Sequence, residues 1–218
     1  MAEPKSARKP AATGPVVYVV DDDQSMREAL TDLFSSMKME VMPFESAQAF
    51  LDKADLGRPG CILLDVRLPG LSGLDFQNHL ERTGNKMPII FMTGFGDIPM
   101  TVRAMKAGAV DFLSKPFREQ DILDAVSVAL ERDARNRQDR AASDAVAVLA
   151  ATLTPREREV MGAVVKGLMN KQIAFALGIS EITVKLHRGN VMRKMEARSV
   201  ADLVRKVELL DPSSPPVA

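Results

Sequence analysis

Three carboxylates, a hydroxyl and an ammonium group follow apolar, β-rich runs of the sequence. The runs and the groups that end them are VVYVV before Asp21 and Asp22, CILLD ending at Asp65, PIIFM before Thr93 and VDFLS before Lys115. Carboxylate oxygens are the ligands that Mg²⁺ prefers, together with waters and phosphate oxygens. Brought to one place, these groups can therefore hold Mg²⁺ and a phosphoryl group.

The runs that carry these groups predict a parallel sheet. Five short β-rich runs, at 16–20, 40–44, 61–65, 88–92 and 110–114, alternate with stretches of helical apolar spacing. This alternation is typical of an α/β, doubly wound, five-stranded parallel sheet with helices on both faces. Since ligands of such sheets bind beyond the carboxyl ends of the strands, the groups above are expected to meet there.

After the last of these runs the sequence changes character. The first half, residues 15–130, holds 11 basic and 17 acidic residues, whereas residues 154–207 hold 11 basic and 5 acidic ones, although the whole chain is formally neutral. An acidic half and a basic half in 218 residues predict two domains.

The basic half contains cap residues whose spacing predicts a set of short helices. Thr154, Pro155 and Glu157 form a capping-box pattern, and Asn170 and Ser180 are predicted to cap later helices. NKQIAFALGISEITVKLHRGNVMRKM then has the layout of a helix-turn-helix, with Ala174 at the helix crossing, Gly178 in the turn and Val184 in the core. A basic second helix suits the major groove of DNA.

Composition also bears on where the protein works. A single cysteine, Cys61, cannot form an internal disulfide, and no run of about 18 apolar residues occurs. The basic N-terminal segment has no apolar stretch typical of a secretory signal. We therefore expect a cytoplasmic protein with no membrane partner.

These observations predict the following division of the chain. The segments are a disordered tail 1–14, an α/β domain 15–131, a helical linker 132–152, a helix-turn-helix domain 153–210 and a tail 211–218.

Residues 16–131 closely resemble the receiver domain of two-component response regulators. The resemblance implies that Asp65 accepts a phosphoryl group from a histidine kinase, and that Mg²⁺ is held by Asp21, Asp22, Asp65 and the backbone carbonyl of Arg67. It also implies that Lys115 pairs with the phosphoryl oxygens and that Thr93 and Phe112 act as a coupled switch, with a cis peptide before Pro116. Bulky Phe95 is expected to shield the phosphorylated Asp65.

Residues 153–207 resemble the LuxR-type output domain, and the order of the parts resembles the FixJ/NarL group. The resemblance implies base contacts by Lys185, Leu186 and Gly189, with Thr183 near the start of the recognition helix. Phosphate contacts are expected from Lys171, Gln172, Arg188 and Arg193. It further implies a dimer formed through residues 98–130, and contact with RNA polymerase is expected. The last helix is amphipathic, and its apolar stripe is expected either to close the bundle or to pair two output domains.

We therefore expect a transcription regulator rather than an enzyme, apart from its own phosphorylation and dephosphorylation. Two alternatives remain open at this stage. One is a Mg²⁺-dependent aspartyl-phosphate phosphatase, although that group carries its nucleophile in a D-x-D motif after the first strand. The other is a phosphorylation-switched interaction module whose basic bundle binds protein and not double-stranded DNA.

Overall fold

The computed structural model describes residues 14–94 and 98–210. The expected tail 1–14, apart from Gly14, the expected tail 211–218 and Phe95 lie outside the described residues. No helix in the described ranges combines the length and apolar character needed to cross a membrane.

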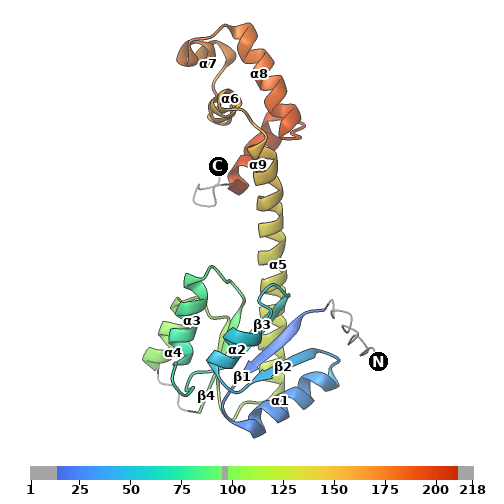
Figure 1. The fold of residues 1–218 in the computed structure, drawn as a ribbon, viewed down its shortest axis with the longest axis vertical. Helices are drawn as coiled ribbons and strands as arrows, with labels where there is room; N and C mark the ends of the chain where they lie inside the picture. The colour runs from blue at the N-terminus through green and yellow to red at the C-terminus, as the bar shows by residue number, and fades with distance from the viewer. Residues whose placement is uncertain (1–13, 95–97, 211–218) are drawn as a thin grey trace, which may run out of the picture. The chain divides into compact units, whose positions relative to one another are not determined.

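The first unit is built on one parallel sheet (Figure 1). Its strands are β1 Val16–Val20, β2 Glu40–Phe44, β3 Gly60–Asp65, β4 Ile89–Thr93 and β5 Asp111–Ser114. They lie in the order β2-β1-β3-β4-β5, and each pair is parallel. The predicted fold class is confirmed, with strand ends displaced by no more than one residue.

Five helices connect and follow the strands of this sheet. They are α1 Gln24–Ser36, α2 Ala47–Lys53, α3 Gly73–Arg82, α4 Ile98–Lys106 and α5 Glu119–Ala151. One core packs Phe50 of α2, Phe76 of α3 and Ala104 of α4 against one face of the sheet. A second core packs Phe34 of α1 and Ile122 of α5 against the other face. Burial on both faces explains why β1, β3 and β4 are apolar along their length.

The sheet order determines where the polar strand ends meet. β1 pairs with β2 on one side and with β3 on the other, so the chain reverses its direction of winding at β1. Val20 of β1 is in register with Leu64 of β3, one residue before Asp65. The ends of β1 and β3 are therefore adjacent at the switch point of the sheet.

The helix α5 runs without a break from Glu119 to Ala151. Its residues up to Asn136 belong to the first compact unit and those from Arg137 to the second. Within the first unit, the buried carboxylate of Asp133 accepts a hydrogen bond from the N–H of Gly60 at 2.9 Å. A Cβ added at Gly60 would lie 2.2 Å from the Val16 carbonyl oxygen, so only glycine fits this strand start.

Up to residue 210, where its described part ends, the second unit contains four further helices. They are α6 Pro155–Val165, α7 Asn170–Leu177, α8 Glu181–Lys194 and α9 Val200–Leu210. Ile173, Val184, Val191 and Leu203 are buried in its core, together with Val146 of α5.

Most predicted helix ends in this unit are confirmed. Thr154 and Glu157 form the capping box, and Gly178 ends α7 with φ of 63°. The prediction for Asn170 was wrong: Met169 is the N-cap, and the Met169 N–H donates to Gln172 Oε1 at 2.8 Å. Asn170 is instead the first helical residue, and its Oδ1 accepts a hydrogen bond from Arg188 at 2.8 Å.

Acidification is expected to destabilise the second unit through Glu157. The buried Glu157 carboxylate accepts hydrogen bonds from Lys194 Nζ at 2.6 Å and from the Thr154 N–H at 2.8 Å. These bonds lower the pKa of Glu157 to about 2, against an ordinary value of 4.5. Because the unfolded chain binds the proton first, this stabilisation is complete above the unfolded pKa and is lost as the pH falls from there toward 2.

Urea unfolding across this pH range checks the expectation. The variant Glu157→Gln should be less stable than the parent at neutral pH and should show a shallower dependence on pH. Glu159→Gln, which alters a half-exposed carboxylate paired with Arg156, is the matched control. Equal pH dependence in the parent and in Glu157→Gln would contradict the assignment.

Candidate phosphoryl-acceptor and DNA-binding sites

Three carboxylates lie together at the carboxyl ends of β1 and β3. Oxygen atoms of Asp21, Asp22 and Asp65 all lie within 4.8 Å of one another. Asp21 and Asp65 are buried, whereas Asp22 is exposed. The adjacent Asp23 is the N-cap of α1, and its carboxylate accepts the Ser25 N–H at 2.9 Å.

The ammonium group of Lys115 joins two of these carboxylates. Lys115 follows β5, and its Nζ donates to Asp21 Oδ2 at 2.6 Å and to Asp65 Oδ2 at 2.5 Å. The remaining oxygens of these two carboxylates accept backbone N–H groups, from Asp23 at 3.0 Å and from Arg67 at 2.8 Å. One ammonium facing three carboxylates leaves the cluster with excess negative charge.

Burial and pairing act in opposite directions on the ionisation of this cluster. Burial raises the pKa of the Asp21 carboxyl above its ordinary value, and the hydrogen bond from Lys115 opposes that rise. Burial also lowers the pKa of Lys115, but its hydrogen bonds to Asp21 and Asp65 outweigh this effect and raise the pKa overall. Lys115 is therefore a permanent cation at neutral pH.

The donor set fits a hard divalent cation. All three side chains offer carboxylate oxygens, and the exposure of Asp22 leaves room for water ligands. Mg²⁺ prefers a few carboxylates with waters and phosphate oxygens, so the residues present match it. The excess negative charge of the cluster favours the same ion.

Thr93 and Phe112 lie on β4 and β5 beside this cluster. Thr93 is fully buried at the end of β4, and its carbonyl accepts the Lys115 N–H at 2.6 Å. The half-buried ring of Phe112 packs near the Phe91 ring, with centroids 6.2 Å apart. The peptide bond between Lys115 and Pro116 is cis, as the receiver resemblance implied. Phe95 lies outside the described residues, so its shielding of the phosphorylated Asp65 stays a prediction.

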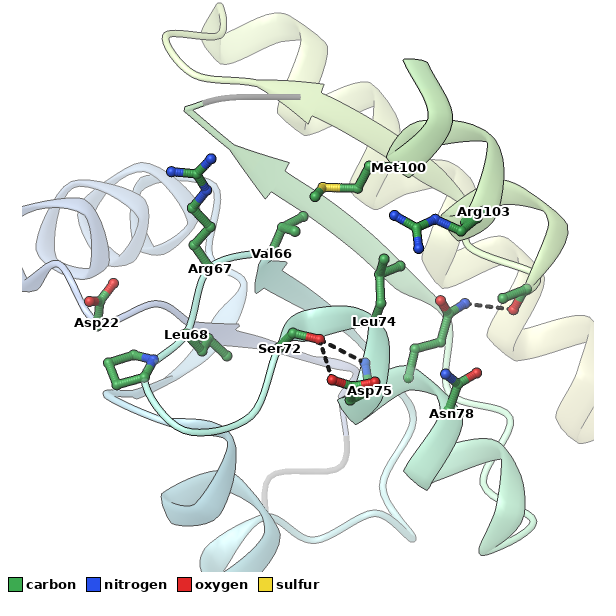
Figure 2. Close-up of a pocket in the computed structure, with 13 residues that line it drawn as sticks. Asp22, Val66, Arg67, Leu68, Ser72, Leu74, Asp75, Asn78, Met100 and Arg103 are labelled. Atoms are coloured by element: carbon green, nitrogen blue, oxygen red, sulfur yellow. Dashed lines mark hydrogen bonds between the residues drawn. The ribbon is translucent and has the colours of Figure 1, made fainter. Parts of the chain in front are cut away.

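The loop after β3 brings backbone close to Asp65. Gly70 has φ of 86°, and a Cβ added at Gly73 would lie 2.7 Å from the Asp65 carbonyl oxygen. These two glycines therefore permit the tight return of the chain into α3. Figure 2 shows Asp22 and Arg67 on the same side of the cavity that opens next to this loop.

The expected DNA contacts lie on α7 and α8. The exposed members are Lys171, Gln172, Lys185, Leu186, Gly189 and Arg193, and the half-buried ones are Thr183 and Arg188. Some are engaged within the unit: the Gln172 side chain accepts the Met169 N–H, Arg188 donates to Asn170, and Arg193 donates to Asn190. Leu186 is 64% exposed, so its side chain is accessible on the surface of α8.

Several exposed or positioning residues were not assigned a role from the sequence. Phe175 of α7 is 92% exposed and Ile182 of α8 is 80% exposed. The run IAFAL is apolar throughout, so its spacing alone does not separate exposed Phe175 from buried Ile173. Near the acidic cluster, Arg27 of α1 donates to the Asp21 carbonyl oxygen at 2.7 Å and holds the backbone after β1.

Comparison with known families agrees with both halves of this description. Residues 17–127 match the response regulator receiver domain, and residues 151–207 match the bacterial regulatory proteins of the luxR family. The chain therefore belongs to the response regulators that join a receiver domain to a LuxR-type DNA-binding domain.

Individual relatives span almost the whole chain. Nodulation protein W of Bradyrhizobium diazoefficiens is 56% identical over 200 residues, which cover 92% of this chain and 88% of that protein. Transcriptional regulatory protein FixJ of Azorhizobium caulinodans is 47% identical over 189 residues, covering 87% and 90%. A solved structure of the response regulator StyR is 50% identical, with a TM-score of 0.76 over 89% of this chain and 98% of that one.

Proposed function

We propose that this response regulator accepts a phosphoryl group on Asp65 from the histidine of a sensor kinase and, once phosphorylated, binds DNA as a dimer through α8. The observation that carries the proposal is the bridge from Lys115 Nζ to Asp21 and Asp65, at 2.6 and 2.5 Å, within a cluster of three carboxylates. This bridge places a cation against the only carboxylate of the three that ends β3.

The chemistry follows from these charges. A carboxylate oxygen of Asp65 attacks phosphorus, the P–N bond to the kinase histidine breaks, and its electron pair stays on the imidazole nitrogen. A carboxylate approaches an anionic phosphoryl group readily only when cations cancel the repulsion between them. Lys115 is one such cation. Mg²⁺ held by Asp21, Asp22, Asp65 and the Arg67 carbonyl supplies further cancellation when bound.

The same site accounts for a switch. The Thr93 hydroxyl turns toward a phosphoryl oxygen and donates to it, and the Phe112 ring follows into the space that Thr93 vacates. This shift favours a receiver state that dimerises through residues 98–130, and a few kcal/mol of preference is enough to change which state predominates. The paired output domains, joined also through α9, read adjacent half-sites and contact RNA polymerase.

Intact mass measurement tests the receiver chemistry. The full chain is incubated with acetyl phosphate and Mg²⁺, and its mass is followed over time. A gain of one phosphoryl group per chain that requires Mg²⁺ supports the proposal. No gain would contradict uptake from this donor. Hydrolysis of a phosphate ester, para-nitrophenyl phosphate, at far more than one equivalent per chain would favour a phosphatase instead.

DNA binding is expected to depend on Lys171 through charge. The exposed Lys171 is proposed to contact a phosphate, so Lys171→Gln should weaken binding to all duplexes. The slope of log K against log salt should fall in magnitude by about 1 for each bound protomer, because each protomer releases one fewer counterion. Fluorescence anisotropy of the chain phosphorylated with acetyl phosphate and Mg²⁺, with a random-sequence duplex over a range of salt concentrations, measures this slope.

The matched control for this measurement is Lys53→Gln, which removes an exposed lysine from α2 of the other unit. It should leave the affinity and the salt slope unchanged. If the phosphorylated parent shows no salt-dependent binding to duplex DNA, this part of the proposal fails and a protein-binding role for the basic unit is favoured.

A further inference from the structure

A cavity of about 800 Å³ lies between the loop after β3, α3 and α4. Asp22 and Arg67 line it on the side of the acidic cluster, and Asn78 and Arg103 line it on the opposite side (Figure 2). Its volume falls within the range of roughly 300–1,000 Å³ that is typical of small-molecule sites. The phosphoryl chemistry uses only the Asp22 side, so the space between α3 and α4 has no role in it.

A buried hydrogen-bond acceptor of a residue that lines this cavity has no partner in the part of the chain that the structure describes. Gln77 of α3 is 3% exposed, and its Nε2 donates to the Ala107 carbonyl at 2.6 Å. Because a carbonyl can only accept, this bond establishes which end of the Gln77 amide carries the nitrogen. The other end, Oε1, is buried and has no hydrogen-bond partner among the described residues. Buried polar atoms are nearly always satisfied, so Oε1 calls for a donor.

The cavity also presents an arginine that is available to bind an anion. Arg103 of α4 is exposed, and its guanidinium group forms no hydrogen bond or ion pair with the part of the chain that the structure describes. It extends from α4 toward Leu74 and Met100, which with Val66 and Leu68 form the apolar lining (Figure 2). A guanidinium group pairs with a carboxylate through two parallel hydrogen bonds.

We propose that this cavity binds a small organic acid. The carboxylate of the acid pairs with Arg103, its apolar body lies against Leu74 and Met100, and a hydroxyl or amide N–H donates to Gln77 Oε1. The ligand joins α3 to α4, and α4 begins the face through which the receiver is proposed to dimerise. The protein thus has a second chemical input beside phosphorylation, and the binding itself does not require the proposed phosphoryl transfer.

The test uses the full chain without a phosphodonor and with para-hydroxybenzoate as the probe. Binding is followed by amide NMR titration, with and without Mg²⁺. Saturable shifts on α3 and α4 are expected, and para-methoxybenzoate, which has no hydroxyl donor, should bind about tenfold more weakly. Inorganic phosphate is titrated separately for comparison. If para-hydroxybenzoate shifts only amides on the Asp22 side, as phosphate does, the proposal is overturned.

Two arginine variants make the test specific to this cavity. Gln77 and Ala107 also line a second cavity of about 410 Å³, whose wall includes the exposed Arg132 of α5. Arg103→Gln should weaken para-hydroxybenzoate binding about tenfold or more, whereas Arg132→Gln should leave it unchanged. Equal losses in both variants, a loss in Arg132→Gln alone, or no saturable binding to the parent would overturn the proposal.

Discussion

Replacing Asp65 by alanine is expected to abolish phosphoryl uptake completely. Asp65 is buried but keeps 8% exposure, its carboxylate contacts Lys115 Nζ directly, and its second oxygen accepts the Arg67 N–H. Asp21 is not expected to replace it, because Asp21 is fully buried at 0% exposure and a donor cannot reach its carboxylate. Intact mass after incubation with acetyl phosphate and Mg²⁺ measures the loss.

The control for this experiment is Asp52→Ala, which removes an exposed carboxylate from α2 and should leave uptake unchanged. Asp65→Ala also removes one of the like charges around Asp21, so thermal unfolding should show a folded protein no less stable than the parent. A folded Asp65→Ala variant that gains mass as fast as the parent would place the acceptor elsewhere.

The second large effect is expected at Lys115. Lys115→Gln keeps a side chain that can donate hydrogen bonds but removes the positive charge that bridges Asp21 and Asp65. Loss of one such stabilising group from a transition state typically costs about 10²–10³ in rate. The rate of phosphoryl uptake from acetyl phosphate should therefore fall by that factor, while one phosphoryl group per chain remains the limit.

A binding measurement separates this effect from simple misfolding. Without the ammonium group, Asp21 and Asp65 lose their internal cation, so calorimetric titration should show tighter Mg²⁺ binding in Lys115→Gln than in the parent. Lys86→Gln, which alters an exposed lysine before β4, should change neither the uptake rate nor Mg²⁺ binding. An uptake rate for Lys115→Gln within about twofold of the parent would rule out the electrostatic role.

Sequence patterns predicted the helices and strands and many of the residues at which they begin or end. Alternating apolar runs predicted the five strands to within one residue, and Thr154 with Glu157 predicted the start of α6. These features depend on residues close together in the chain, which is why local spacing carries them. The predicted N-cap at Asn170 was wrong. The Asn170 side chain instead accepts a hydrogen bond from Arg188, 18 residues away in the chain, and local spacing does not predict such a contact.

The sequence predicted which polar groups meet at the acidic site, because the carboxyl ends of the strands of a parallel sheet converge at one edge. The sequence alone thus determined an α/β sheet, a basic helical unit and the residue types available for phosphoryl and DNA chemistry. Only the tertiary structure decided that Lys115 bridges both Asp21 and Asp65, and that Asp133 holds Gly60. It also decided that Gln77, whose Oε1 has no partner among the described residues, lines the same cavity as Arg103. Such contacts join residues far apart in the chain, and their geometry depends on how helices pack on the sheet, which no local pattern encodes.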